Sequence, residues 1–106
     1  MIEITDKDFH EKVLKKSLKT PVVTDFWASW CMPCRILAPI LEKLEKEYKN
    51  RFVLAKINIE ENKETAKTYG VMNIPSVKMI KEGKVVAEFT GAIPEEVVRE
   101  WLDRNL

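Results

Sequence analysis

Two cysteines separated by two residues are the most reactive feature of this 106-residue chain. The chain has no other cysteines. They lie in the segment Trp30-Cys31-Met32-Pro33-Cys34. A thiolate attacks disulfides, and a second thiol one helical turn away can displace the mixed disulfide that results. The spacing therefore predicts a dithiol that cycles between a reduced form and a Cys31–Cys34 disulfide.

Cys31 is expected where a strand ends and a helix begins. Unpaired N–H groups and the positive end of the helix dipole favour a thiolate at such a position. We expect Cys31 to be exposed in the loop as the nucleophile, and Cys34 to be the resolving thiol. Pro33 suits a first helical turn, which does not need its missing N–H. Met32 and Pro33 lie over the sulfurs and are expected to tune their reactivity.

Other interpretations of the pair are less consistent with the sequence. A zinc site needs four ligands, and the chain offers two thiols and one distant imidazole, His10, so we predict no bound metal. Inert core thiols do not fit the turn that Trp30 and Pro33 indicate. A purely structural disulfide is disfavoured by the start of the chain, which turns acidic and polar without a basic, apolar leader. That start predicts a cytoplasmic protein.

A buried carboxylate is expected close to the cysteines. Asp25 interrupts the apolar run from Val22 to Ala28, which is typical of a central strand. Burial should raise the pKa of Asp25, or a cation should pair with it. Lys56 is the candidate cation, because it lies within a neighbouring apolar strand. A structural ion pair and a catalytic role both remain open at this point.

The apolar pattern of the first half predicts elements that present these residues. A short strand at Ile2 to Ile4 is followed by a helix that Asp6 caps and Thr20-Pro21 ends, with its apolar residues on one face: Phe9, Val13, Leu14 and Leu18. The strand from Val22 precedes a helix kinked at Pro39, whose inward residues are Leu37, Ile40, Leu41, Leu44 and Tyr48.

The second half predicts one more buried strand, two helices and a hairpin. Phe52 to Ile59 is the strand, and a short helix runs from an Asn62 cap to Tyr69, closed by Gly70. Ser76 to Ile80 and Lys84 to Phe89 form the hairpin. Pro94 opens a last helix with these residues inward: Val97, Val98, Trp101 and Leu102. This β-α-β-α-β-α-β-β-α order predicts one α/β domain over residues 1–106, with parallel central strands and helices on both faces.

Composition excludes several classes of protein. Apolar residues make up 45% of the chain, but no apolar run approaches the roughly 20 residues of a membrane span. Lys and Arg number 18 against 17 Asp and Glu, so the cationic excess that binds nucleic acid is absent. We therefore expect neither membrane nor nucleic acid among the partners.

The sequence resembles the thioredoxin family over essentially its whole length. The resemblance rests on Asp25-Phe26-Trp27-Ala28-Ser29-Trp30-Cys31-Met32-Pro33-Cys34, on Ala38-Pro39, and on Lys56, Ile74-Pro75, Gly83 and Gly91. A single C-x-x-C is a weak signal, whereas this ordered set is specific. It implies a thioredoxin fold, in which about four helices flank a mixed sheet of about five strands.

The resemblance also implies an activity and roles for individual residues. It implies a monomeric protein-disulfide reductase with no bound cofactor, whose partners are disulfide-containing proteins and a reductase that recharges it. Asp25 would exchange protons with Cys34. A cis bond at Ile74-Pro75 would pack against the cysteines. The substrate would contact these residues: Trp30, Ile74, Pro75, Gly91 and Ala92.

Met32 departs from the family, which usually has glycine there. Because residues between the cysteines influence the reduction potential, a glutaredoxin-like, disulfide-forming or isomerising protein stays open beside the reductase. A non-catalytic module that binds a partner through Trp30, Ile74 and Gly91 is a further alternative, which the presence of both cysteines disfavours.

Overall fold

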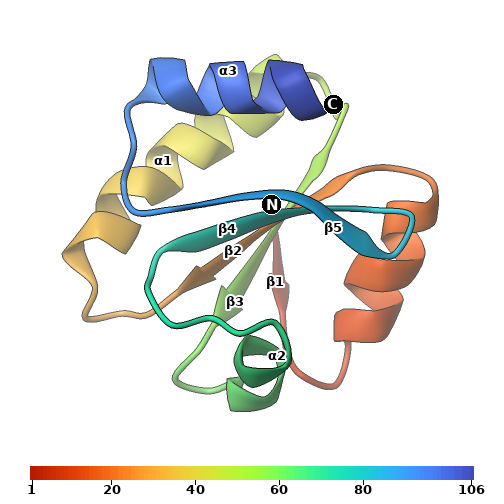
Figure 1. Cartoon of the computed structure of the whole chain (residues 1–106), viewed down its shortest axis with the longest axis vertical. Coiled ribbons are helices and arrows are strands. Elements are labelled where there is room, and N and C mark those ends of the chain that lie inside the picture. The colour runs from red at the N-terminus through yellow and green to blue at the C-terminus, as the bar shows by residue number, and fades with distance from the viewer.

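A mixed five-stranded sheet forms the centre of the computed structural model, which describes residues 1–106 (Figure 1). Its strands are β1 (Ile2–Ile4), β2 (Val22–Trp27), β3 (Val53–Asn58), β4 (Ser76–Lys81) and β5 (Lys84–Thr90). They lie in the order β1-β3-β2-β4-β5. β3 is parallel to β1 and β2, whereas β4 is antiparallel to β2 and β5. The predicted central position of β2 beside parallel β3 is confirmed.

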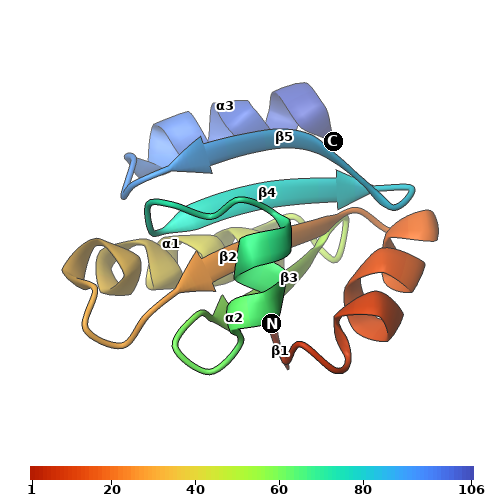
Figure 2. The same cartoon turned by 60° about the horizontal axis from the view of Figure 1, so that its bottom comes forward.

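Helices cover both faces of the sheet, as predicted (Figure 2). α1 (Met32–Glu47) and α3 (Glu95–Asn105) pack on one face. α2 (Lys63–Thr68) packs on the other, together with an N-terminal helical segment. That segment is a π-helix, η1 (His10–Lys15), followed by a 3₁₀ turn, η2 (Lys16–Leu18). None of the helices combines the length and the apolar character needed to cross a membrane.

Two hydrophobic cores hold these layers together. The core beneath α1 and α3 has eleven buried residues: Val23, Leu37, Leu41, Leu44, Phe52, Leu54, Val77, Met79, Val98, Trp101 and Leu102. The core on the opposite face has nine: Ile4, Phe9, Val13, Val22, Phe26, Ala55, Ile57, Ala66 and Ile80. Because successive strand residues point to opposite faces, odd positions of β2 serve the first core and even positions the second. Asp25 therefore lies on the α1 face.

Asp6 caps a different helix from the one predicted. Its carboxylate accepts hydrogen bonds from the backbone N–H groups of Glu64 (3.3 Å) and Thr65 (2.9 Å), in the first turn of α2. Asn62 occupies the N-cap position of α2, but its side chain makes no capping bond and instead accepts from the N–H of Asp6 at 2.9 Å. The predicted Asn62 cap was thus also wrong. Tertiary contact replaced a local cap with one from 59 residues away.

Two residues predicted to face inward are exposed. Leu18 is 63% exposed, whereas Ser17 beside it is buried, because the segment is a π-helix followed by a 3₁₀ turn and lacks the α-helical spacing that places Leu18 on the face of Phe9 and Val13. Val97 is 43% exposed, whereas Val98 beside it is buried. Neighbouring residues of a helix project about 100° apart, so one of the two valines must turn towards solvent.

Candidate active site

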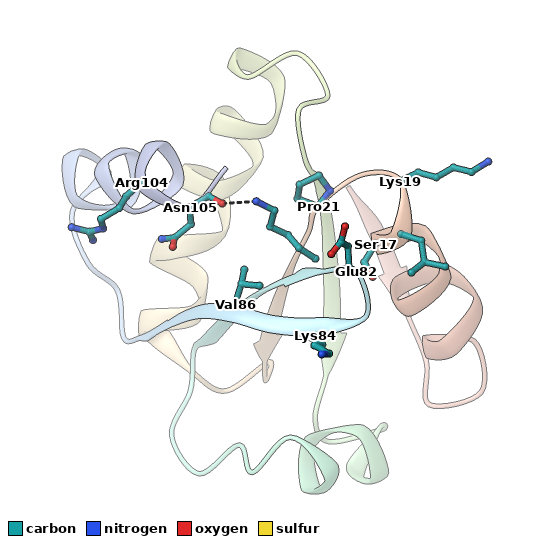
Figure 3. Close-up of a pocket in the computed structure, with 10 residues that line it drawn as sticks. Ser17, Lys19, Pro21, Glu82, Lys84, Val86, Arg104 and Asn105 are labelled. Carbon is teal, nitrogen blue, oxygen red and sulfur yellow. Dashed lines mark hydrogen bonds between the residues drawn. The ribbon is translucent and has the colours of Figure 1, made fainter.

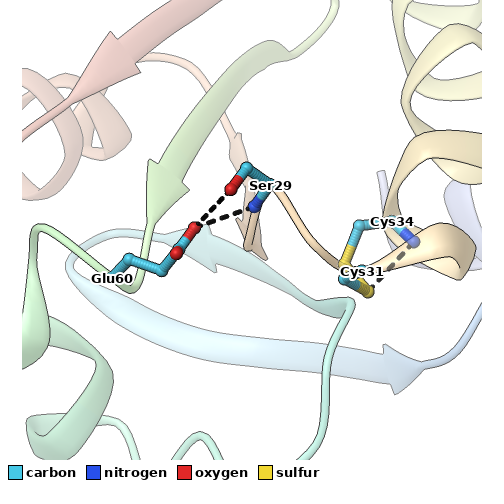
Figure 4. Close-up of a disulfide and its surroundings, with 4 residues drawn as sticks. All are labelled: Ser29, Cys31, Cys34 and Glu60. Carbon is cyan, nitrogen blue, oxygen red and sulfur yellow. Dashed lines mark hydrogen bonds between the residues drawn. A yellow bond between two sulfur atoms is a disulfide. The ribbon is translucent and has the colours of Figure 1, made fainter.

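The two cysteines lie after the end of β2, at the start of α1, as predicted (Figure 4). Cys31 is the N-cap of α1, and Pro33 follows in the first turn without leaving an unpaired donor. The backbone N–H of Cys34 donates to Cys31 Sγ at 3.2 Å. The residues form a disulfide, with 5.3 Å between their Cα atoms. The helix start thus places the two sulfurs within bonding reach and gives the first one a backbone donor.

The expected exposure of Cys31 was wrong. Cys31 is only 5% exposed and Cys34 only 1%. Ala28 is buried with them, and Trp27, Ile59 and Ile74 pack around the pair. The residues that reach solvent here are the apolar side chains of Trp30 and Met32, which are 69% and 61% exposed. The accessible surface around the pair is therefore mostly apolar, and Cys31 is slightly more exposed than Cys34.

Asp25 is fully buried in the middle of β2, as the sequence predicted. Neither of its carboxylate oxygens has a hydrogen-bond partner. This desolvation raises the pKa of Asp25 to about 7, while the positive charge of Lys56 opposes the rise and the negative charge of Glu42 adds to it. Asp25 can therefore both hold and release a proton close to neutral pH.

Lys56 is aligned with Asp25 in the β2–β3 register but does not pair with it. Its ammonium lies 4.9 Å from the centre of the Trp27 ring, a cation–π contact. The predicted ion pair is therefore not formed, and Lys56 acts on Asp25 only as a nearby charge. The face of the Trp27 ring is thus in contact with this cation.

The predicted cis peptide bond at Ile74-Pro75 is confirmed. The backbone N–H and C=O of Ile74 make no hydrogen bond within the protein. The N–H of Gly91 donates to the C=O of Pro75 at 2.9 Å, and Gly91 has a φ of +86° that glycine adopts easily. Ala92 follows with its side chain exposed. The fold thus brings the Gly91 segment to the Pro75 junction, and Ile74 to the cysteines.

Sequence reasoning missed a contact between two loops. Glu60 Oε1 accepts hydrogen bonds from the backbone N–H of Ser29 at 2.9 Å and from its hydroxyl at 2.8 Å (Figure 4). These bonds lower the pKa of Glu60 below its ordinary value, the backbone bond most strongly. Ser29 follows β2 and Glu60 follows β3. That placement, at the carboxyl ends of neighbouring parallel strands, was the signal available in the sequence.

A hollow of about 650 Å³ lies at the opposite end of the sheet (Figure 3). Four of its lining residues are cationic: Lys19, Lys81, Lys84 and Arg104. Lys19 and Arg104 point away from each other, and Lys81 donates to the C=O of Asn105 at 3.0 Å. The Ser17 hydroxyl that lines the hollow donates to the C=O of Leu14 at 2.6 Å, and both cysteines of the chain lie outside the hollow.

Comparison with known proteins agrees with this geometry. The family model described as Thioredoxin matches residues 1–104. A protein named thioredoxin from Buchnera aphidicola subsp. Acyrthosiphon pisum is 44% identical over 106 residues, covering all of this chain and 96% of the relative. Another, from Chlorobaculum thiosulfatiphilum, is 39% identical over 104 residues, covering 98% of this chain and 94% of the relative. Thioredoxin C-2 of Corynebacterium nephridii is 39% identical over 106 residues, covering 100% and 96%.

Proposed function

Because this chain belongs to the thioredoxin family, we propose that it reduces disulfides with Cys31 as the attacking thiolate and Cys34 as the resolving thiol. The chain is a thiol–disulfide oxidoreductase, and thioredoxins are protein-disulfide reductases. The observation that carries the assignment of roles is the disulfide-bonded pair at the start of α1, in which Cys31 is the more accessible residue.

The reaction proceeds by two exchanges. The Cys31 thiolate attacks one sulfur of the substrate disulfide, whose S–S bond breaks and releases the second substrate sulfur as a thiolate. Cys34 then attacks Cys31 Sγ, which breaks the mixed disulfide, closes the Cys31–Cys34 bond and frees the first substrate sulfur. Two electrons pass from the cysteine pair to the substrate.

Asp25 is proposed to accept the proton that Cys34 loses when it attacks. Lys56 is proposed to assist, because its positive charge limits the rise in the pKa of Asp25. A base works best when its pKa lies near the working pH, and that of Asp25 is raised to about 7. Full burial and unpaired oxygens support this role, because a merely structural carboxylate would be expected to have hydrogen-bond partners.

The substrate is proposed to bind as an extended chain beside Ile74. Free backbone N–H and C=O groups at Ile74 can pair with such a chain, as an added strand would. Pro75 contributes no competing N–H. Trp30 provides apolar contact, while Gly91 and Ala92 let the substrate backbone approach closely.

The remaining expectations complete the proposal. The partners are disulfide-containing proteins and a reductase that restores the dithiol. The protein acts as a cytoplasmic monomer, forms one thioredoxin domain over residues 1–106, and needs no bound cofactor. Met32, 61% exposed beside the sulfurs, and Pro33 tune the redox properties of the pair.

The roles of the cysteines are tested by reduction of insulin with dithiothreitol as the electron source. We expect the wild type to accelerate reduction and Cys31→Ser to abolish the acceleration. Pre-reduced Cys34→Ser, mixed with insulin after the dithiothreitol has been removed, should instead accumulate a mixed disulfide, detected by mass spectrometry, because no second thiol is present to resolve it. Accumulation of the mixed disulfide on Cys34 in a Cys31→Ser protein would reverse the two roles.

The direction of electron flow is tested by the reduction potential of the pair, measured by equilibration with dithiol buffers. A value near about −270 mV supports a general reductase. A value of about −120 to −180 mV would mean that the protein donates or reshuffles disulfides. In that case Met32→Gly should lower the potential.

A further inference from the structure

The loop that presents Cys31 has few attachments of its own. Trp30 is 69% exposed, and Ser29 is exposed beside it. Within the loop, the N–H of Cys31 donates to the C=O of Ala28 at 3.2 Å. Apart from the bond between the two cysteines, Glu60 is the only side chain that bonds to residues 28–33. Ala28 and Cys31 are buried, whereas the exposed Ser29 is held from outside the loop by its hydrogen bonds to Glu60 alone.

Glu60 is itself held firmly. Its N–H donates to the side-chain oxygen of Asn58 at 2.8 Å, and the N–H of Ile59 donates to the C=O of Trp27 at 2.9 Å. The second bond extends the β2–β3 ladder one step beyond the sheet. The backbone of Glu60 is thus fixed at the end of the sheet, and its side chain extends to the loop that follows β2.

We propose that Glu60 is a positioning residue, which acts through Ser29 to hold Trp30 and Cys31 in the orientation that a folded protein disulfide requires. This inference rests on the proposed function. One carboxylate oxygen receives both donors of Ser29, which fixes the backbone and the side chain of that residue together. A small disulfide needs only access to Cys31, whereas a protein substrate must also fit against Trp30.

The charge of Glu60 favours the contact at neutral pH. Hydrogen bonds to an ionised acceptor are stronger than those to a neutral one. The pKa of Glu60 is lowered, chiefly by the backbone N–H of Ser29, so the carboxylate remains ionised throughout the neutral range. An amide oxygen at the same place would keep the acceptor but lose the charge.

The test uses the pre-reduced full chain, mixed either with insulin or with a small aromatic disulfide. For Glu60→Ala we expect roughly tenfold slower reaction with insulin, because loss of orientation raises the barrier. The rate with the small disulfide should stay within about twofold of wild type. Ser29→Ala, which removes one of the two donors, should give a smaller loss with insulin. Glu60→Gln should restore most of the lost rate.

Glu61→Ala is the matched control, since Glu61 is the neighbouring exposed carboxylate and makes no hydrogen bond or ion pair. It should react as the wild type does with both disulfides. The proposal is overturned if Glu60→Ala reduces insulin at the wild-type rate, or slows both disulfides equally, or if Glu60→Gln is as slow as Glu60→Ala. Failure of the wild type itself to reduce insulin would instead refute the proposed function.

Discussion

Asp25 and Lys78 are charged residues buried in adjacent strands of one sheet, on opposite faces, and their surroundings differ. The ammonium of Lys78, which is 6% exposed, bonds to the carboxylate of Glu88 on β5 at 2.6 Å. Thr24 on the same face donates its hydroxyl to the C=O of Lys78 at 2.8 Å. Asp25, on the other face, has no hydrogen-bond partner for either oxygen.

The difference fits a structural charge at Lys78 and supports the chemical role proposed for Asp25. A buried charge with a partner costs the fold little, whereas a buried carboxylate without one destabilises it unless it keeps its proton. Lys78 is provided with a partner across the β4–β5 hairpin. Asp25 lacks one and lies in the layer of the cysteine-bearing helix, where the proposed mechanism requires a proton acceptor.

The largest expected effect comes from Asp25→Asn. In the folded protein Asp25 keeps its proton up to about pH 7, whereas in the unfolded chain it loses the proton near pH 3.8. Stability should therefore fall as pH rises through this window, by up to roughly 4 kcal/mol, and then level off. Urea unfolding of the oxidised protein should show Asp25→Asn more stable than wild type at pH 8, and nearly equal to it at pH 3, below the pKa of the unfolded chain.

The same variant tests the chemistry of Asp25. If Asp25 takes the proton of Cys34, the rate of disulfide reduction by Asp25→Asn should lose its pH dependence near pH 7 and fall at pH 8. An unchanged pH profile in the variant would remove the proton-transfer role and leave the stability effect alone.

A smaller effect is expected from breaking the Lys78–Glu88 pair. Glu88→Ala leaves a buried ammonium without its partner, and we expect a loss of about 2 kcal/mol in the free energy of unfolding. Lys78→Met replaces the cation by an apolar side chain of similar length and should change stability by less than about 1 kcal/mol.

The free energy of unfolding of the double variant isolates the interaction between the two side chains. Adding Glu88→Ala to Lys78→Met should cause no further loss of stability, because the cation is already absent. Rates of disulfide reduction should be the same in all three. A larger loss for Lys78→Met than for Glu88→Ala would contradict this account of the pair.

The smallest effect is expected from Lys56→Met. Loss of the nearby positive charge should raise the pKa of Asp25 above its present value of about 7. Loss of the contact with the Trp27 ring should cost about 1 kcal/mol in stability. Titration of Asp25 by NMR checks the first expectation. Lys63→Met on exposed α2 is the control, and an equal shift there would show a general charge effect rather than a local one.

Features governed by neighbouring residues were predictable from the sequence. The apolar run around Asp25 predicted a central strand and the burial of its carboxylate, and the turn residues around Gly83 predicted the hairpin. Gly70 was expected in the left-handed region at the end of α2 and adopts a φ of +63°. In each case the local pattern and the tertiary structure favour the same conformation.

Features governed by distant residues were not predictable in the same way. Asp6 has the residue type of a local cap, but folding places the first turn of α2 within its reach. Ser29 and Glu60 are 31 residues apart and each resembles an ordinary surface residue. Cys31 is mostly covered because residues from other segments, Ile59 and Ile74, pack around the pair. Such contacts depend on the three-dimensional meeting of loops, which periodicity does not encode.

The strand order has a consequence for how this protein meets unfolded chains. An open sheet edge is a template on which other chains polymerise. Here one edge is β1, only three residues long, and the other is β5, which carries Lys84 and Glu88 and pairs with β4 through a register shift at Met79/Ile80. Neither edge offers a long, regular row of free backbone groups. The fold is thereby protected from adding the strands of unfolded chains to either edge of its sheet.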